Sequence, residues 1–177
     1  MDLSFDGYRL ELLATQLNSE FFNLIEKNRS YIKKGFPKTC SLCSTLEKTR
    51  DFVANAVQKI TNQTEYFYVI KDNTTLVGLI HIKNLDNEVL KCELGYFIDE
   101  DYKGKNITSR AVKEIIAFCK NQLEMNKIYI CTSGDNIGSQ KVALKNGFVK
   151  EGVLRNEFKD ADNKLHDVHY FGLTPLK

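Results

Sequence analysis

From Tyr66 onward, the spacing of apolar residues changes from a helical period to a strand-like one. Three segments rich in aromatic and branched side chains follow one another, at residues 66–70, 76–82 and 89–98. Asp72-Asn73 and Asp86-Asn87 separate them, and these residue types favour turns because their side chains hydrogen-bond the nearby backbone. The three segments therefore predict an antiparallel meander whose apolar faces need a covering layer.

Segments with helical periodicity flank this meander and can supply that layer. Upstream, residues 17–32 and a segment beginning near Thr45 have apolar residues three and four apart, and a loop through Gly35, Pro37 and Ser41 joins them. Downstream lie a helix at residues 107–123 and a short helix after Asn136 that ends near Gly147, a residue suited to the left-handed conformation after a helix.

The remaining strands lie at both ends of the chain. A first strand is expected at residues 7–12, another at 127–132, and a final hairpin at 148–158 and 165–173 that turns at Asp162-Asn163. The order is then β-αα-βββ-α-β-α-ββ, which predicts an α/β protein with a mixed (α+β) sheet and helices packed against it. No repeat, low-complexity tract or linker divides residues 1–177, so a single domain is expected.

Composition narrows the classes of function. A net charge of +2 argues against strong sequence-independent attraction to nucleic acid. The N-terminus lacks the features of a secretion signal, and no apolar stretch is long enough for a membrane span. Five cysteines form an odd set, which fits reduced thiols better than a disulfide framework. A cytoplasmic protein without direct nucleic-acid or membrane partners is expected.

One strand-to-helix connection suits an anion. Residues 99–110 are rich in turn-forming residues and lead into a predicted helix, whose free N–H groups and dipole favour a pyrophosphate. Lys103 and Lys105 would add positive charge there. A capped helix start with solvated lysines explains the same residues, so the pattern alone leaves both readings open.

Metal binding finds little support. Cys40 and Cys43 have zinc-like spacing, but no second pair accompanies them, and the three histidines lack the spacing of metal ligands. No metal is therefore expected. Positive charge gathers near the first helix, which is usual for a solvated surface; the residues are Lys27, Arg29, Lys33, Lys34 and Lys38.

Several motifs in order resemble the GNAT acetyltransferases, and more narrowly their RimJ/RimL branch. They are Cys92-Glu-Leu-Gly-Tyr-Phe-Ile-Asp-Glu-Asp-Tyr-Lys-Gly-Lys-Asn-Ile-Thr108, Asp135-Asn-Ile-Gly-Ser-Gln-Lys-Val-Ala-Leu-Lys-Asn-Gly-Phe-Val-Lys-Glu-Gly-Val-Leu-Arg155 and His166-Asp-Val-His-Tyr-Phe-Gly-Leu173. The resemblance covers nearly the whole chain and is nearest to the RimL-type enzymes that modify a ribosomal stalk protein. It implies the GNAT fold and acetyl-CoA as co-substrate.

The resemblance assigns the cofactor contacts. The strand ending at Phe97 and Ile98 would separate from its neighbour and pair its backbone with the pantetheine arm, and one N–H would stabilise the oxyanion. The pyrophosphate would meet Lys103, Gly104, Lys105, Asn106, Ile107 and Thr108. The family pattern Q/R-x-x-G-x-G/A falls on Lys103, Asn106 and Thr108, none of which matches it. Asn106 is expected at positive φ, which Asn tolerates better than other non-glycine residues.

The resemblance also points to catalytic groups. Asn136 would contact the cofactor, although helix capping explains it equally well. Ser139 would lie near the cofactor sulfur and protonate the departing thiolate. Many GNAT enzymes use a tyrosine at the position of Ala143, which makes Ser139 the better candidate here. Glu157 and Glu93 are the candidate general bases, each with a structural explanation as well.

The expected reaction is transfer of acetyl from acetyl-CoA to a primary amine by direct attack. The resemblance implies a protein N-terminus as acceptor, that of a ribosomal stalk protein. A small amine such as a polyamine, an amino acid or an antibiotic is the alternative acceptor. A non-catalytic binding module that retains the fold is a further alternative, because Asn106 replaces a glycine. The oligomeric state stays open, with a homodimer as one option.

Overall fold

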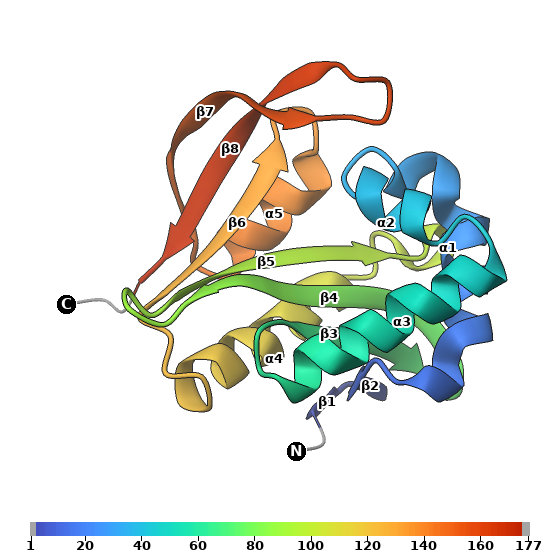
Figure 1. Cartoon of the computed structure of the whole chain (residues 1–177). Coiled ribbons are helices and arrows are strands. Elements are labelled where there is room, and N and C mark those ends of the chain that lie inside the picture. Colours follow the sequence, from blue (N-terminus) through green and yellow to red (C-terminus); the bar gives the residue numbers. More distant parts are fainter. Residues whose placement is uncertain (1–2, 175–177) are drawn as a thin grey trace.

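Eight strands form one mixed sheet with helices on both faces in the computed structural model, which describes residues 3–174 (Figure 1). The strands are β1 (Leu3–Phe5), β2 (Tyr8–Leu12), β3 (Tyr66–Asp72), β4 (Thr75–Asp86), β5 (Lys91–Ile98), β6 (Lys127–Ser133), β7 (Val149–Lys159) and β8 (Leu165–Leu173). The α-helices are α1 (Asn18–Ile32), α2 (Pro37–Leu42), α3 (Leu46–Thr61), α4 (Ile107–Asn121) and α5 (Ile137–Lys145). Short 3₁₀ turns lie at Thr15–Leu17 and Glu100–Tyr102.

Alternating side chains of the sheet fill two apolar cores. On β3, Tyr68 and Ile70 pack into the core with α4 residues such as Ile115. Phe67 and Val69 point the other way, into the core built with α1, α2 and α3. Because successive strand residues face opposite sides, a continuous apolar strand must be covered on both faces. The predicted meander therefore forms the buried centre of a three-layer molecule.

The sheet opens between β5 and β6. The strand order is β1-β2-β3-β4-β5-β6-β8-β7, and among these described strands only β5 and β6 pair in parallel. Their pairing covers three positions and ends at Glu93 opposite Tyr129. Beyond it β6 pairs with β8 alone, and Figure 1 shows β6 running away from β5 at an angle. The separation expected from the resemblance is confirmed, and it leaves one edge of residues 94–98 without a strand partner among residues 3–174.

Several local predictions are confirmed by the backbone. Thr45 caps α3 by accepting a hydrogen bond from the N–H of Lys48 at 3.2 Å. Gly147 follows α5 with φ of 81°, and Asn163 turns the last hairpin with φ of 63°. The mixed sheet and the predicted order of its elements are present as well.

Two connections differ from the prediction. The expected single first strand is the second arm of a hairpin, in which β1 precedes β2 and the turn uses positive φ at Asp6 and Gly7. The expected loop through Gly35, Pro37 and Ser41 contains the helix α2, with Pro37 in its first turn. Proline fits the first helical position because its missing N–H would have no partner there. Within residues 3–174, no helix has the length and apolar character needed to cross a membrane.

Candidate active site

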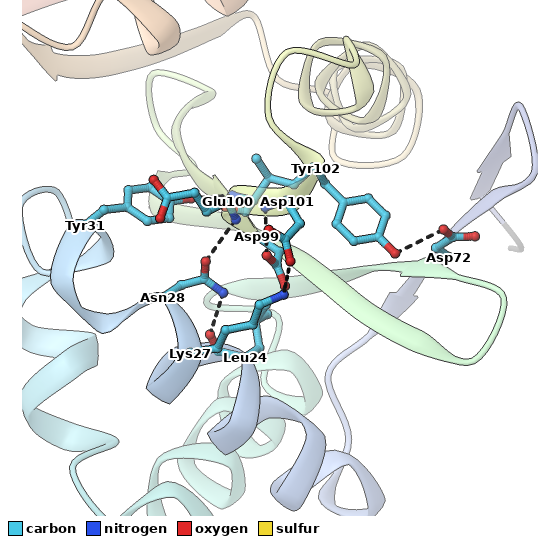
Figure 2. Close-up of polar contacts among 10 residues, drawn as sticks. Leu24, Lys27, Asn28, Tyr31, Asp72, Asp99, Glu100, Asp101 and Tyr102 are labelled. Carbon is cyan, nitrogen blue, oxygen red and sulfur yellow. Dashed lines mark hydrogen bonds and ion pairs between the residues drawn. The ribbon is translucent and has the colours of Figure 1, made fainter.

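Ion pairs of Lys27 connect helix α1 to the turn that follows β5. The ammonium group of Lys27 lies 2.8 Å from Asp99 Oδ2 and 2.6 Å from Asp101 Oδ2 (Figure 2). The two carboxylates raise the pKa of Lys27 above its usual range, and Lys27 in turn lowers the pKa of Asp101. Lys27 is exposed, as expected for a lysine near the first helix, but it also forms two ion pairs that no local pattern predicts, because Asp99 and Asp101 lie 72 and 74 residues further along the chain.

The buried side-chain amide of Asn28 stabilises the same turn. Asn28 is 1% exposed, and its Oδ1 accepts a hydrogen bond from the N–H of Glu100 at 2.9 Å (Figure 2). Its Nδ2 donates to the carbonyl of Leu24 at 3.0 Å, so the buried side chain is satisfied at both ends. Tyr102 adds a bond from its hydroxyl to Asp72 at 3.2 Å. The turn between β5 and α4 is thus fixed from two sides.

The hydroxyl of Tyr31 meets the free edge of β5 at Ile98. The N–H of Ile98 donates to this hydroxyl at 3.3 Å, and the hydroxyl donates to the carbonyl of the same residue. Burial raises the pKa of Tyr31 to about 12, so the hydroxyl is neutral and can both donate and accept. One side chain therefore satisfies the backbone groups that a ligand extended along β5 would need.

The register of the strand distinguishes Ile98 from Phe97. The N–H of Asp99 bonds the carbonyl of Val77 in β4. Because backbone groups of an antiparallel strand face its two neighbours alternately, those of Phe97 and Asp99 face β4 and those of Ile98 face the opening. The Phe97 side chain packs edge-on against Phe36, with ring centroids 5.3 Å apart. Of the two expected contacts, Ile98 is the one whose backbone faces the opening.

The loop before α4 has the backbone expected of an anion site. Gly104 and Asn106 take φ of 77° and 63°, which confirms the prediction that Asn106 adopts positive φ. The Asn106 side chain does not cap α4. The first N–H groups of this helix, from Ile107 to Ser109, have no acceptor within the helix, as in any helix start. Thr108 is half-buried beside them.

Three lysines surround this loop. Lys103 lies over the ring of Tyr31, 3.4 Å from its centroid, and pairs with Glu100 at 3.0 Å. Lys105 lies 4.8 Å from the ring centroid of Tyr102. Lys145 of α5 donates to Asn106 Oδ1 at 3.0 Å. The predicted Lys103 and Lys105 thus lean toward aromatic rings, and Lys145, which the sequence did not suggest, adds a third cation.

Ser139 lies in the first turn of α5, on the other side of the opening from β5. Asn136 caps this helix, and its Oδ1 accepts a hydrogen bond from the N–H of Ser139 at 3.1 Å. The hydroxyl of Tyr96 on β5 lies 3.1 Å from Ser139 Oγ and 3.2 Å from the Ser139 carbonyl. The Ser139 hydroxyl is therefore free of helix capping and is turned toward β5.

The two candidate bases have different surroundings. Glu93 is buried, with one carboxylate oxygen 2.9 Å from Lys83 Nζ and the other bonded by Asn84 at 2.7 Å. Glu157 is exposed where the β7–β8 ladder is interrupted, and it forms no ion pair in the described part of the chain. Burial, helped by both carboxylates, raises the pKa of Cys131 to about 12. Glu93 and Glu157 thus lie near one thiol, and Glu157 has the freer carboxylate.

Arg29, His81 and His166, which were also singled out in the sequence, have structural partners. Arg29 donates to the carbonyls of Cys40 and Cys43 at 2.6 and 2.7 Å, so it joins α1 to α2 rather than lining a basic patch. His81 bonds Glu65, and His166 bonds Asp160, each at 2.6 Å. No cluster of metal-ligating side chains occurs within residues 3–174.

Tyr31, Tyr96 and Lys145 were not identified from the sequence. Their partners lie 67, 43 and 39 residues away in the chain. No local pattern marks such pairs, because only the folded sheet brings the open edge of β5 near α1 and α5. An isolated tyrosine in an apolar segment otherwise indicates core packing.

Comparisons with known proteins identify a family and relatives with similar sequences. The model of the family "Acetyltransferase (GNAT) domain" matches residues 10–149. The "Putative ribosomal N-acetyltransferase YdaF" of Bacillus subtilis is 33% identical over 99 residues, which are 56% of this chain and only about half (54%) of that relative. The ribosomal-protein-serine acetyltransferase of Escherichia coli is 27% identical over 148 residues, or 82% of each chain.

The fold is also found in solved structures. A ribosomal L7/L12 alpha-N-protein acetyltransferase named RimL, solved with coenzyme A, superposes with a TM-score of 0.91. The match covers 98% of both chains at 18% identity, so this likeness concerns the fold. The family match spans the opening between β5 and β6, the loop before α4 and the first turn of α5. The chain therefore belongs to the GNAT family of acetyl-CoA-dependent N-acetyltransferases.

Proposed function

We propose that this chain acetylates the N-terminal amine of a protein, and that the acceptor belongs to the ribosomal proteins. Relatives named for ribosomal proteins support this acceptor class. The amine would attack the thioester directly. Burial keeps the thiols of Cys40, Cys43 and Cys131 protonated by raising their pKa, which disfavours an acyl-cysteine intermediate. Free cysteines and the ribosomal acceptor class both favour a cytoplasmic location.

The opening between β5 and β6 carries this proposal. The pantetheine arm would pair with Ile98 at the free edge of β5, which lacks a strand partner beyond Glu93. The pyrophosphate would take the N–H groups at the start of α4, with Lys105 and Lys145 supplying positive charge. Ser139 would then face the sulfur from α5, and Glu157 would accept the amine proton, directly or through water.

Positive charge just after α1 and at the start of α2 favours a protein acceptor over a polyamine. Lys33 and Lys34 are exposed just after α1, Lys38 is exposed in the first turn of α2, and none of the three forms an ion pair within residues 3–174. Their positive field would attract an acidic protein segment and repel a cationic polyamine.

The acceptor class is tested by measuring acetylation of a peptide that starts with serine and carries acidic residues. Spermidine is the alternative acceptor in the same assay. Reversing the three lysines to glutamate should raise the KM for the peptide several-fold at low salt. The effect should shrink near physiological ionic strength, where screening acts over about 8 Å. A control that reverses the exposed Lys113, Lys120 and Lys150 has the same net charge and should leave this KM nearly unchanged. Faster acetylation of spermidine than of the peptide would contradict the proposed acceptor.

Displacement of Tyr31 gives a separate prediction about the cofactor. The pantetheine arm can pair with Ile98 only after the Tyr31 hydroxyl has left. Tyr31→Phe removes this competitor and should tighten acetyl-CoA binding about 2- to 10-fold, since a neutral hydrogen bond contributes roughly 0.5–1.5 kcal/mol. Titration calorimetry measures the change. Tyr102→Phe, which removes a hydroxyl bonded to Asp72, is the control and should not tighten binding. Weaker binding by Tyr31→Phe would show that the hydroxyl contributes to the cofactor site.

A further inference from the structure

The hydroxyl of Tyr96 has an unusual partner for a tyrosine in an apolar core. Its ring packs against the core that includes α4, yet its hydroxyl reaches the first turn of α5. There it lies 3.1 Å from Ser139 Oγ and 3.2 Å from the Ser139 carbonyl oxygen. The contact crosses the region where β5 and β6 no longer pair. Tyr96 thus links the strand that would hold the thioester to the serine that would meet its sulfur.

The chemistry of the three groups limits how they can bond. Burial raises the pKa of Tyr96 to about 12, so its hydroxyl stays protonated at neutral pH and offers one hydrogen. The Ser139 carbonyl can only accept a hydrogen bond, whereas Ser139 Oγ can donate and accept. Tyr96 can donate to the carbonyl and accept from Ser139, or donate to Ser139 Oγ and leave the serine hydrogen free. Either arrangement holds Ser139 Oγ on the side of β5.

We propose that Tyr96 is a positioning residue for Ser139 in acetyl transfer. Its hydroxyl holds Ser139 Oγ toward the free edge of β5, and by donating to Oγ it directs the serine hydrogen toward the cofactor sulfur. This inference rests on the proposed function, in which Ser139 serves the leaving group. Tyr96 itself does not touch the reacting atoms and keeps its proton throughout.

Departure of the cofactor thiol needs no proton donor or acceptor beyond the enzyme, the amine and water. As the tetrahedral intermediate collapses, the carbon–sulfur bond breaks and its electron pair goes to sulfur. The Ser139 hydroxyl gives its proton to that sulfur and regains one from water. The attacking amine enters in its neutral form and loses one proton to water, directly or through the carboxylate base, which then releases it. This proton replaces the one that water returns to Ser139, so the solvent neither gains nor loses a net proton in the step. Tyr96 contributes orientation, which matters because proton transfer needs hydrogen-bond geometry between donor and acceptor.

A purely structural role is the competing explanation, and a double-mutant cycle separates the two. Tyr96→Phe keeps the buried ring and removes only the hydroxyl. It should lower kcat about 5- to 30-fold, with the KM and Kd for acetyl-CoA within about 2-fold, as expected when an interaction acts chiefly in the transition state. In a Ser139→Ala background, the same change should alter kcat less than about 2-fold, because the two residues act as a unit.

The control is Tyr68→Phe. Tyr68 lies in the same core, burial likewise raises its pKa to about 12, and its hydroxyl bonds no other residue in the described part of the chain. This variant should keep kcat within about 2-fold of the wild type. Concentrations of active sites are taken from acetyl-CoA titration, so partial unfolding of a variant cannot imitate a loss of kcat.

If the wild type transfers acetyl to the serine peptide, either of two results would overturn the inference. One is a Tyr96→Phe variant with unchanged kcat. The other is an effect of Tyr96→Phe that multiplies in full with that of Ser139→Ala, which would show that the residues act independently. A wild type that binds acetyl-CoA but acetylates neither the peptide nor spermidine would overturn the proposed function, and this inference with it.

Discussion

Replacing Ser139 by alanine should lower kcat about 100-fold and leave the affinity for acetyl-CoA nearly unchanged. A single general acid contributes on the order of 10²–10⁴-fold in rate. A thiolate is a tolerable leaving group even without a proton, so the effect should lie at the low end of this range. The loss should appear in kcat because the sulfur needs the proton only as the carbon–sulfur bond breaks. Steady-state kinetics with the serine peptide, together with calorimetry, measure both quantities.

Stability separates this role from helix capping. Asn136, not Ser139, caps α5, so Ser139→Ala should lower the melting temperature only slightly. Thr45→Ala provides the contrast, because Thr45 caps α3 away from the site. Losing that cap should cost about 0.5–2 kcal/mol of stability with kcat unchanged. If Ser139→Ala instead loses stability and acetyl-CoA affinity while kcat survives, Ser139 is a structural residue.

Replacing Asn106 by valine should weaken acetyl-CoA binding about 5- to 100-fold, whereas glycine should bind within about 3-fold of the wild type. Asn106 has φ of 63° and ψ of 9°, a conformation that strongly disfavours a branched side chain. Such strain costs on the order of 1–3 kcal/mol, which the loop can relieve by moving the N–H groups at the start of α4. Both variants lose the bond from Lys145, so their difference reports the backbone conformation alone.

The control for Asn106→Val is Asn163→Val. Asn163 has the same φ of 63° but lies in the turn between β7 and β8. This variant should lose thermal stability and keep its affinity for acetyl-CoA. Equal affinities of the valine, glycine and wild-type proteins at position 106 would show that this loop does not hold the pyrophosphate.

The order of the elements could be predicted because its signals are local. The change of period at Tyr66, the cap at Thr45 and the glycine at Gly147 each act within a few residues. The positive φ of Asn106 followed from the family resemblance, because Asn106 falls on a glycine position of the family pattern and Asn tolerates this conformation. The missed helix α2 shows the weakness of such signals, since Pro37 serves equally well as the first residue of a helix and as part of a loop.

The contacts of the site could not be predicted in the same way. In the sequence, Lys27 cannot be distinguished from the other lysines near the first helix. It pairs with Asp99 because the fold brings the turn after β5 beside α1. Tyr31 and Tyr96 meet Ile98 and Ser139 only because the sheet opens beyond Glu93. Pairs this far apart in the chain depend on the tertiary fold, which a single sequence does not reveal.

A crystal structure of the chain with bound acetyl-CoA tests the account most directly. The account predicts that the pantetheine arm pairs with the backbone of Ile98, that the Tyr31 hydroxyl has moved away, and that the pyrophosphate lies at the N–H groups of Lys105 to Ser109. The cofactor sulfur should lie within hydrogen-bond reach of Ser139 Oγ. Acetyl-CoA bound elsewhere, or bound here while Tyr31 still contacts Ile98, would contradict it.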